Sequence, residues 1–333
     1  MFKRQTWLRR VTPLVCGALT WLASTQALAQ AQDYPSKPIT MVMPYAAGGP
    51  GDVITRIYAA AMQKALGQQV IVENPAGAAG SIGTAKVARS KPDGYTLLMI
   101  HVSHATNPFM FKNLSYNPVE DFEPIGLATE GPMLLVARKD FPARDAREFL
   151  DYVRANASKL SMGHAGPGSA AHLCNLKFMQ ALKVDITQVP YKGAAPALND
   201  LMGGQLDLMC DQTTNTVPSL QGQRIKAYTA AGKSRLSSMP ELPAMNELGV
   251  AGFDISIVFS LYAPKATPKP VIEKLTAALQ YAVKDPEVKQ KLGSLGAEPV
   301  SAERARPEAL RVHLKHEIDT LAPLLIKAGA QVN

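Results

Sequence analysis

The chain has 333 residues, of which 47% are hydrophobic, 6% aromatic and 19% charged, and its formal net charge is +8. A chain of this length is long enough for two domains. The charges are interspersed, and no basic run with interleaved aromatic residues appears, which argues against a nucleic-acid partner. We therefore look for a globular protein with a small-molecule partner.

The first 29 residues have the three parts of a secretory signal peptide. Residues 11–24 are mostly apolar, and a small-x-small cleavage pattern, Ala27-Leu-Ala29, follows them. The basic head before this stretch contains Lys3, Arg4, Arg9 and Arg10. We expect cleavage after Ala29, with Ala31 as the alternative, and a retained anchor helix is the competing interpretation.

Removal of this leader lowers the formal net charge of the chain. The residues of the leader argue against a lipoprotein and leave two export routes open. The leader holds four basic and no acidic residues, so the formal charge falls from +8 to +4. Cys16 follows Val15 and lies inside the apolar core, which argues against a lipoprotein. The pair Arg9-Arg10 leaves twin-arginine export open beside the general secretory route. No later segment offers the roughly 20 uninterrupted apolar residues of a membrane helix, so we expect a soluble mature chain.

Only two cysteines, Cys174 and Cys210, remain after the leader. In an oxidising compartment they could form one disulfide, although a buried pair of free thiols is equally open. They are too few for a metal site, and the sequence contains neither an HExxH nor a CxxC pattern. We expect no metal and no cofactor.

The first structural unit joins a strand to a helix through a glycine-rich loop. The apolar residues 39–43 lead into a loop at residues 44–52 and then into an amphipathic helix that ends at Leu66. The first backbone N–H groups of a helix lack internal partners and lie at the positive end of its dipole. A bare loop at this position predicts a cradle for a carboxylate or a phosphate.

Strand-like and helix-like segments alternate along the rest of the chain. Continuous apolar runs separated by helices indicate βαβ units with parallel strands and helices on both faces. The predicted strands lie at residues 70–73, 96–100, 133–137, 160–163, 186–190, 206–210, 225–230 and 259–264. The predicted helices begin at Ser81 and after Ser169, and cover residues 146–156, 195–202, 270–283 and 305–328.

Two such series predict an α/β protein with two lobes, each a mixed sheet flanked by helices, and a ligand cleft between them. We expect lobe 1 to comprise residues 34–131 plus 254–333, and lobe 2 to comprise residues 132–253. In open α/β sheets ligands bind beyond the carboxyl ends of the strands, where the glycine-rich loops lie.

A second glycine-rich loop matches the first one. Residues 161–173 run from a strand end into a helix whose expected cap is Ser169. If the two loops face each other, each could hold one carboxylate of an elongated diacid. The alternative is that these glycines only make tight turns.

Several ordered motifs together resemble the substrate-binding proteins of tripartite tricarboxylate transporters, the Bug family. They are Pro44-Tyr-Ala-Ala-Gly-Gly-Pro-Gly-Asp52, Glu73-Asn-Pro-Ala-Gly-Ala-Ala-Gly80, Pro92-Asp-Gly-Tyr-Thr-Leu-Leu98, Asn107-Pro108, Val189-Pro-Tyr-Lys-Gly-Ala-Ala-Pro-Ala197 and Asp200-Leu-Met-Gly-Gly-Gln-Leu-Asp207. The resemblance implies a periplasmic type II binding-protein fold that closes on a small carboxylated solute. It also implies delivery to a membrane transporter with one large and one small subunit.

The resemblance also implies a set of ligand-binding residues. They are Tyr45, Ala46, Ala47, Gly48, Gly49 and Asp52 in the first loop, Gly166, Gly168, Ser169 and Ala170 in the second, and His104, Asn107 and Asp211 elsewhere. The chain departs from the family pattern at His164, where a serine is common, and at Cys210, where an aromatic residue usually precedes the acid. These departures leave the solute open among citrate-like acids, amino-acid dicarboxylates and aromatic carboxylates.

Some of these residues have structural interpretations that compete with ligand binding. Asp52 could be an acid favoured by the helix dipole, and Asn107 could cap a turn before Pro108. His101 and His104 could be satisfied polar residues after a buried strand. Lys192 is better interpreted as a solvated lysine beside a turn than as a partner of the ligand.

Two other classes of function compete with transport. A secreted hydrolase could use Ser169 and His172 with an acid such as Asp211, but the Gly-x-Ser-x-Gly elbow is missing around Ser169. Nucleotide-binding motifs are missing too. A periplasmic sensor that presents its solute to a signalling receptor would use the same fold. We expect a monomeric binding protein that is not an enzyme.

Overall fold

The computed structural model describes residues 34–250 and 252–327. The predicted signal peptide and its cleavage site lie outside these residues, as does the last residue of the predicted C-terminal helix. Within them, no helix is both long and apolar enough to cross a membrane. No cluster of three or more histidine, cysteine or acidic side chains is arranged there to hold a metal ion.

One sheet runs through the described part of the chain, in the order β2-β1-β3-β9-β4-β7-β5-β6, with β8 and β10 also pairing with β4. Its strands are β1 (Ile39–Val42), β2 (Val70–Glu73), β3 (Thr96–Ile100), β4 (Phe122–Arg138), β5 (Ser161–His164), β6 (Thr187–Pro190), β7 (Leu208–Gln212), β8 (Ile225–Ala230), β9 (Ser256–Pro264) and β10 (Glu298–Pro299).

Parallel pairing is confirmed for two groups of strands and is wrong for the others. β1 pairs in parallel with β2 and β3, and β5 pairs in parallel with β6 and β7. By contrast, β9 runs antiparallel to β3 and β4, and β4 runs antiparallel to β7 and β8. The sheet is therefore mixed because two long strands return through its centre.

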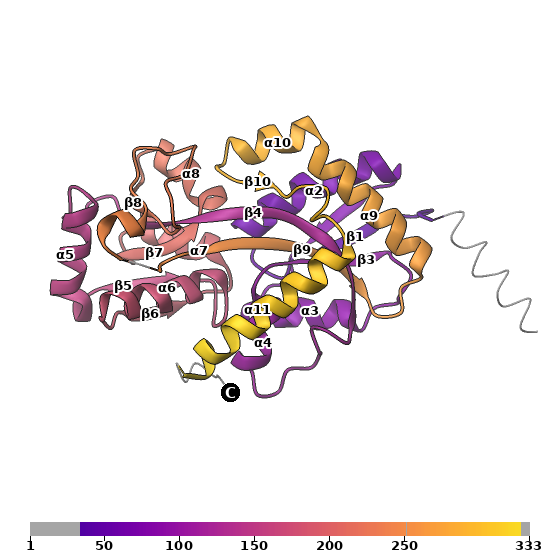
Figure 1. Ribbon diagram of the computed structural model, residues 1–333, viewed down its shortest axis with the longest axis horizontal. Helices are drawn as coiled ribbons and strands as arrows, with labels where there is room; N and C mark the ends of the chain where they lie inside the picture. The colour runs from indigo at the N-terminus through magenta and orange to yellow at the C-terminus, as the bar shows by residue number, and fades with distance from the viewer. Residues whose placement is uncertain (1–33, 251, 328–333) are drawn as a thin grey trace, which may run out of the picture.

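Those two long strands, β4 and β9, connect the two halves of the molecule (Figure 1). Residues 122–132 of β4 pair with β9, whereas residues 133–138 pair with β7 and β8. The lobe boundary expected between residues 131 and 132 falls where β4 changes partners. The division into lobes stays a prediction, and this change of partner is consistent with it.

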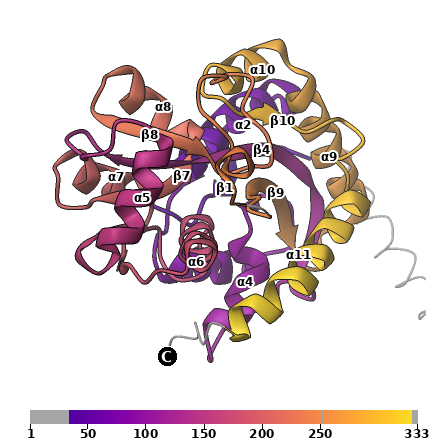
Figure 2. The same cartoon turned by 60° about the vertical axis from the view of Figure 1, so that its left-hand side comes forward.

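Helices pack around both halves of the sheet (Figure 2). They are α2 (Pro50–Leu66), α3 (Ser81–Ala88), α4 (Ser103–Met110), α5 (Ala146–Asn156), α6 (Ala170–Leu182), α7 (Ala194–Met202), α8 (Thr213–Gln221), α9 (Lys269–Lys284), α10 (Pro286–Gly293) and α11 (Pro307–Lys327). In Figure 2, α9, α10 and α11 curve around the half that contains β1, and α5 to α8 surround the half that contains β7.

The first helix shows why these segments fold as they do. Gly49 precedes α2 in extended backbone, Pro50 occupies its first turn, and Gly67 ends it with a φ of 65°. Proline at the start and a left-handed glycine at the end are the usual boundaries of a helix. One face of α2 is fully buried, and its Tyr58 hydroxyl donates a hydrogen bond to the Ala128 carbonyl in β4 (2.5 Å).

Candidate functional site

A small cavity lies between the two halves and is lined by residues from both. It offers about 20 Å³ to the centres of water molecules, which is room for roughly one of them. Its lining residues are Met43, Tyr45, Ala46, Gly49, Pro50, Gly51, His101, Ala165, Ser169, Ala170, Ala171, Ala194, Asp211 and Gln212. Larger grooves exist elsewhere, one of them also lined from both halves, but these grooves do not contain the two glycine-rich loops.

Four helices begin at or beside residues that line this cavity. α2 begins at Pro50, α6 at Ala170 and α7 at Ala194, and α8 begins directly after Gln212. No lysine or arginine is among the described lining residues. Because the N-terminal turns carry unpartnered N–H groups and the positive ends of the helix dipoles, the positive potential here comes from the backbone. Such a cavity attracts an anion without a cationic side chain.

In the first loop, Asp52 holds the backbone in place and does not line the cavity. Its Oδ2 accepts hydrogen bonds from the Gly48 N–H (2.9 Å) and from Arg56 Nε (3.0 Å). The arginine also forms an ion pair with Asp52 at 2.9 Å. These contacts give Asp52 the structural role of an acid in the first helical turn. The carbonyls of Met43 and Tyr45 accept hydrogen bonds from Asn74 Nδ2, which fixes the beginning of the loop.

In the second loop, Ser169 caps α6. Its side chain accepts a hydrogen bond from the His172 backbone N–H (3.3 Å), and His172 Nδ1 accepts one from the Gly168 N–H (3.0 Å). The imidazole therefore binds the loop backbone and not the serine hydroxyl, so these residues lack the contact that a serine hydrolase needs. The following residues, Ala170 and Ala171, line the cavity.

The histidines near the second loop are buried. The rings of His164 and His172 lie 4.6 Å apart, and His164 Nδ1 accepts or donates no hydrogen bond among the residues that the structure describes. Burial, and to a smaller extent the neighbouring His164, lower the pKa of His172 to about 3. Burial also lowers the pKa of His164. Both rings are therefore neutral at ordinary pH.

The loops of the two halves contact each other directly. Thr106 Oγ1 in α4 donates a hydrogen bond to the Gly168 carbonyl (2.7 Å), and the Ala46 N–H donates one to the Lys192 carbonyl (3.4 Å). A side-chain carbon on Gly166 would approach the backbone of Ala79 to 3.4 Å. The halves thus meet on both sides of the cavity.

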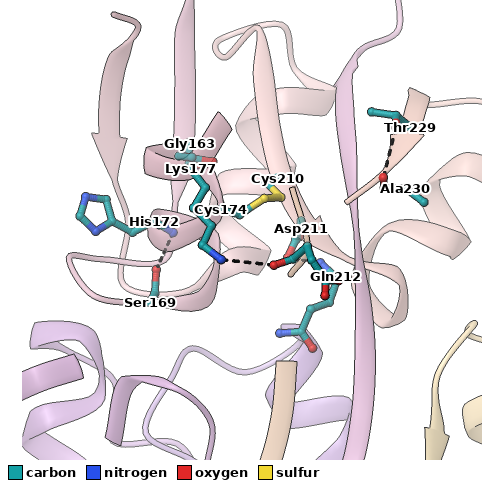
Figure 3. The surroundings of a disulfide bond; sticks show 12 residues. Gly163, Ser169, His172, Cys174, Lys177, Cys210, Asp211, Gln212, Thr229 and Ala230 are labelled. Atoms are coloured by element: carbon teal, nitrogen blue, oxygen red, sulfur yellow. Dashed lines mark hydrogen bonds between the residues drawn. A yellow bond between two sulfur atoms is a disulfide. The ribbon is translucent and has the colours of Figure 1, made fainter. Parts of the chain in front are cut away.

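Asp211 lies at the end of β7, next to a disulfide bond. Its carboxylate oxygens accept hydrogen bonds from the Gln212 N–H (2.8 Å) and from Asn215 Nδ2. Burial raises the pKa of Asp211 to about 6, although these two hydrogen bonds act in the opposite direction. Cys210, the preceding residue, forms a disulfide with Cys174 of α6 (Figure 3). The bond that the sequence left open therefore ties α6 to β7 beside the cavity.

Six of the expected ligand-binding residues line the cavity and seven do not. Those that line it are Tyr45, Ala46, Gly49, Ser169, Ala170 and Asp211. Those that do not are Ala47, Gly48, Asp52, His104, Asn107, Gly166 and Gly168. Several of the second group support the loops, since Gly48 binds Asp52 and Gly168 binds both His172 and Thr106.

His104 and Asn107 belong to the packing beneath the site. The His104 ring lies 4.9 Å from the Phe122 ring and 4.6 Å from the Tyr262 ring, and its Nε2 is 3.0 Å from the Pro118 carbonyl oxygen. Burial lowers the pKa of His104 to about 3. Asn107 Nδ2 donates to the Tyr116 hydroxyl (2.9 Å). Lys192 contributes a backbone carbonyl, and its side chain is exposed.

Sequence reasoning missed part of the lining. Gln212 and Ala194 line the cavity, and neither was among the expected ligand-binding residues. Ala194 begins a helix directly after a glycine, which is the signal that identified the other two loops. Gln212 had no motif of its own, and only its position next to Asp211 could have identified it.

Two α/β halves that meet around a cavity with four helix N-termini beside it are typical of a two-lobed solute-binding protein. The family model described as "Tripartite tricarboxylate transporter family receptor" matches residues 54–311. The chain belongs to this family, which consists of solute-binding receptors and not of enzymes. The two-lobed α/β fold expected from the sequence is thereby confirmed.

Relatives and solved structures support this assignment over nearly the whole chain. A protein of Agrobacterium vitis encoded in the TAR-I ttuE-ttuC' intergenic region is 46% identical over 303 residues, covering 91% of this chain and 88% of the relative. The structure of the periplasmic binding protein BugD is 46% identical with a TM-score of 0.87, covering 90% of this chain and 99% of BugD. MatC of Rhodopseudomonas palustris with bound malate is 39% identical with a TM-score of 0.84, covering 88% and 100%.

Proposed function

We propose that this protein captures a small dicarboxylate in the periplasm and delivers it to a membrane transporter of the tripartite tricarboxylate type. The observation that carries this proposal is the meeting of four helix N-termini around a cavity whose described lining has no lysine or arginine. Backbone N–H groups at helix starts bind carboxylates and cost little reorganisation when the anion arrives. A neutral solute would gain little from the positive electrostatic potential of these helix N-termini.

The solutes of two relatives agree with this chemistry. MatC was solved with malate, and another protein of Rhodopseudomonas palustris, 30% identical with a TM-score of 0.85 and covering 89% of this chain and 99% of that protein, was solved with adipate. Both solutes are dicarboxylates. We infer that each of the two glycine-rich loops takes one carboxylate, with Gly49 and Gly51 on one side and Ala170 and Ala171 on the other.

We further propose that binding requires the two lobes, residues 34–131 plus 254–333 and residues 132–253, to open and close. A dicarboxylate is larger than the roughly single water that the cavity accommodates here. A solute that contacts both loops only when the lobes are closed shifts the population toward the closed state.

A thermal-shift screen of the chain without residues 1–29 tests the proposal. A solute that binds only the folded protein raises its melting temperature, by an amount that grows with concentration above Kd. We expect shifts with malate, succinate or adipate and none with neutral amides of the same length. A panel of mono-, di- and tricarboxylates that produces no shift would contradict the proposal.

A further inference from the structure

A second space lies between the two halves, apart from the cavity, and we call it the hinge groove. It offers about 710 Å³ to the centres of water molecules, against about 20 Å³ in the cavity. One wall lies within residues 293–304 of the first half, and the other is formed by residues 235–238 of the second half. The floor contains Glu130 and Pro132 of β4 and Ser256 of β9, the two strands that connect the halves. A groove in this position must change its width if the halves move relative to each other.

The hinge groove and the cavity lie on opposite faces of the two connecting strands. Phe259 of β9 points toward the cavity, since its ring lies 5.4 Å from the ring of His101, which lines the cavity. Side chains alternate between the two faces of a strand, so Ser256, three residues earlier, points the other way. The register of β4 and β9 is regular here and pairs Val258 with Glu130, so Glu130 shares the face of Ser256.

The floor of the hinge groove is fixed to the wall of the first half. Glu130 accepts hydrogen bonds from Ser256 Oγ (2.9 Å) and from Arg304 Nη1 (2.8 Å). The other wall is fixed within the second half, because Arg235 forms an ion pair with Glu247 at 2.8 Å. Each wall therefore moves with its own half.

The two walls face each other and are joined weakly. A side-chain carbon on Gly296 would lie 3.1 Å from Ser238 Oγ of the opposite wall, so the walls approach each other at this end of the groove. Among the described residues, no hydrogen bond or ion pair joins residues 235–238 to the opposite wall. The walls are therefore free to approach each other when contacts on the cavity side, such as Thr106 with Gly168, are released.

We propose that the hinge groove controls lobe closure: it is wide when the lobes are closed over the solute, narrow when they are open, and a group that fills it holds them closed. This inference rests on the lobe motion in the proposed function. Because β4 and β9 lie between the cavity and the hinge groove, a rotation about these strands that opens the cavity narrows the groove. Filling the groove disfavours the open state and raises the affinity for the solute.

Two tryptophan variants test this proposal. Ser237→Trp adds an indole to one wall and Ser301→Trp adds one to the other, and both serines are exposed in the hinge groove. We expect each variant to bind the solute about 3–10-fold more tightly, because a larger fraction of the solute-free protein is closed. Ser158→Trp adds the same group at an exposed position outside the groove and should leave Kd unchanged. Calorimetry with malate, succinate or adipate gives the Kd of each protein.

Two further measurements follow the movement itself. The double variant Ser237→Cys and Ser301→Cys carries one spin label on each wall, and pulsed electron paramagnetic resonance gives the distance between the labels. We expect bound solute to lengthen this distance. Small-angle X-ray scattering without solute should show that Ser237→Trp is more compact than the Ser158→Trp control.

The possible outcomes separate this inference from the proposed function. A label distance that shortens or stays constant when solute binds would overturn the inference and leave dicarboxylate binding intact. Tryptophan variants in the groove that bind no more tightly than Ser158→Trp would overturn it as well. If no carboxylate binds, the proposed function fails, and the solute-free scattering still tests the groove, since equal compactness of variant and control contradicts the inference. Circular dichroism confirms that each variant is folded.

Discussion

Asp211 is a carboxyl group that the protein buries without a cationic partner among the described residues. It is 1% exposed, and burial raises its pKa to about 6. In the unfolded chain an aspartate has a pKa near 3.9. Between about pH 4 and pH 6 the folded protein therefore keeps a proton that the unfolded chain has lost. Stability falls as the pH rises through this window, and the loss persists at neutral pH.

The substitution Asp211→Asn removes this charge and keeps the shape of the side chain. We expect the variant to be more stable than the unmodified protein by about 1–3 kcal/mol at pH 7.5, with little difference at or below about pH 3, where Asp211 is protonated in both states. Urea unfolding at the two pH values measures the change. A gain of equal size at both would show that packing, and not ionisation, causes it.

Gly49 shows how little space separates the first loop from the second half. A methyl group on Gly49 would lie 3.6 Å from the Ala195 nitrogen and 3.9 Å from the Ala194 nitrogen, which are ordinary contacts. We expect Gly49→Ala to bind the solute nearly normally. The branched side chain of Gly49→Val would cover these helix N–H groups, and we expect its Kd to rise by at least about tenfold. Calorimetry compares the two, and equal affinities would remove this loop from the site.

At the scale of elements, the Cys174–Cys210 disulfide joins the second turn of α6 to the middle of β7. The two cysteines are 36 residues apart, and closing a loop of this length stabilises the folded state by about 4 kcal/mol in the chain-entropy model. The same bond fixes α6, whose first turn lines the cavity, beside Asp211. The disulfide therefore supports both the stability of this half and the geometry of its loop.

We expect the double variant Cys174→Ala and Cys210→Ala to lose about 2–4 kcal/mol of unfolding free energy and to bind the solute more weakly. Urea unfolding and calorimetry measure the two effects. A reducing agent should shift the unmodified protein toward the variant and leave the variant unchanged. If reduction alters neither property, the two thiols do not form this bond in solution.

Local patterns predicted α2 and α6 well, because each follows a buried strand and begins directly after a glycine-rich loop. They did not predict α4 and α8. Pro108 lies within α4 and Pro218 within α8, and α8 begins with two β-branched threonines, so propensity opposes both helices. Tertiary packing decides these elements: the first four residues of α8 are almost fully buried. Gln212, which lines the cavity and immediately precedes α8, was missed together with that helix.

At the scale of the whole molecule, the cavity depends on contacts between residues that are far apart in sequence. The first loop meets residues 192–195, and α4 meets Gly168. A sequence pattern shows that two glycine-rich loops exist. It does not show that the N-termini of α7 and α8 also lie beside the cavity. That arrangement follows from the partner change in β4, which brings the second half next to the first.

The contact between Gly193 and Ala46 provides a direct test of lobe closure. Gly193 has a φ of 171°, an extended conformation that any residue adopts, so substitution there causes no backbone strain. A side-chain carbon at Gly193 would nevertheless lie 2.8 Å from Ala46 Cβ and 2.9 Å from the Ala46 nitrogen in the other half. Contacts under 3 Å between carbon atoms are repulsive, so the two halves must move apart to accommodate it.

We expect Gly193→Ala to fold with an unchanged melting temperature without solute and to bind the proposed dicarboxylate about 5–30-fold more weakly, because it disfavours only the closed state. Calorimetry gives the Kd, and small-angle X-ray scattering at saturating solute should show a less compact particle than the unmodified protein. Gly222→Ala adds the same methyl group after α8, where the nearest atom is the Pro218 carbonyl oxygen at 3.4 Å, and should change neither measurement. If Gly193→Ala binds as tightly as this control, the halves do not close at residues 46 and 193 when the solute binds.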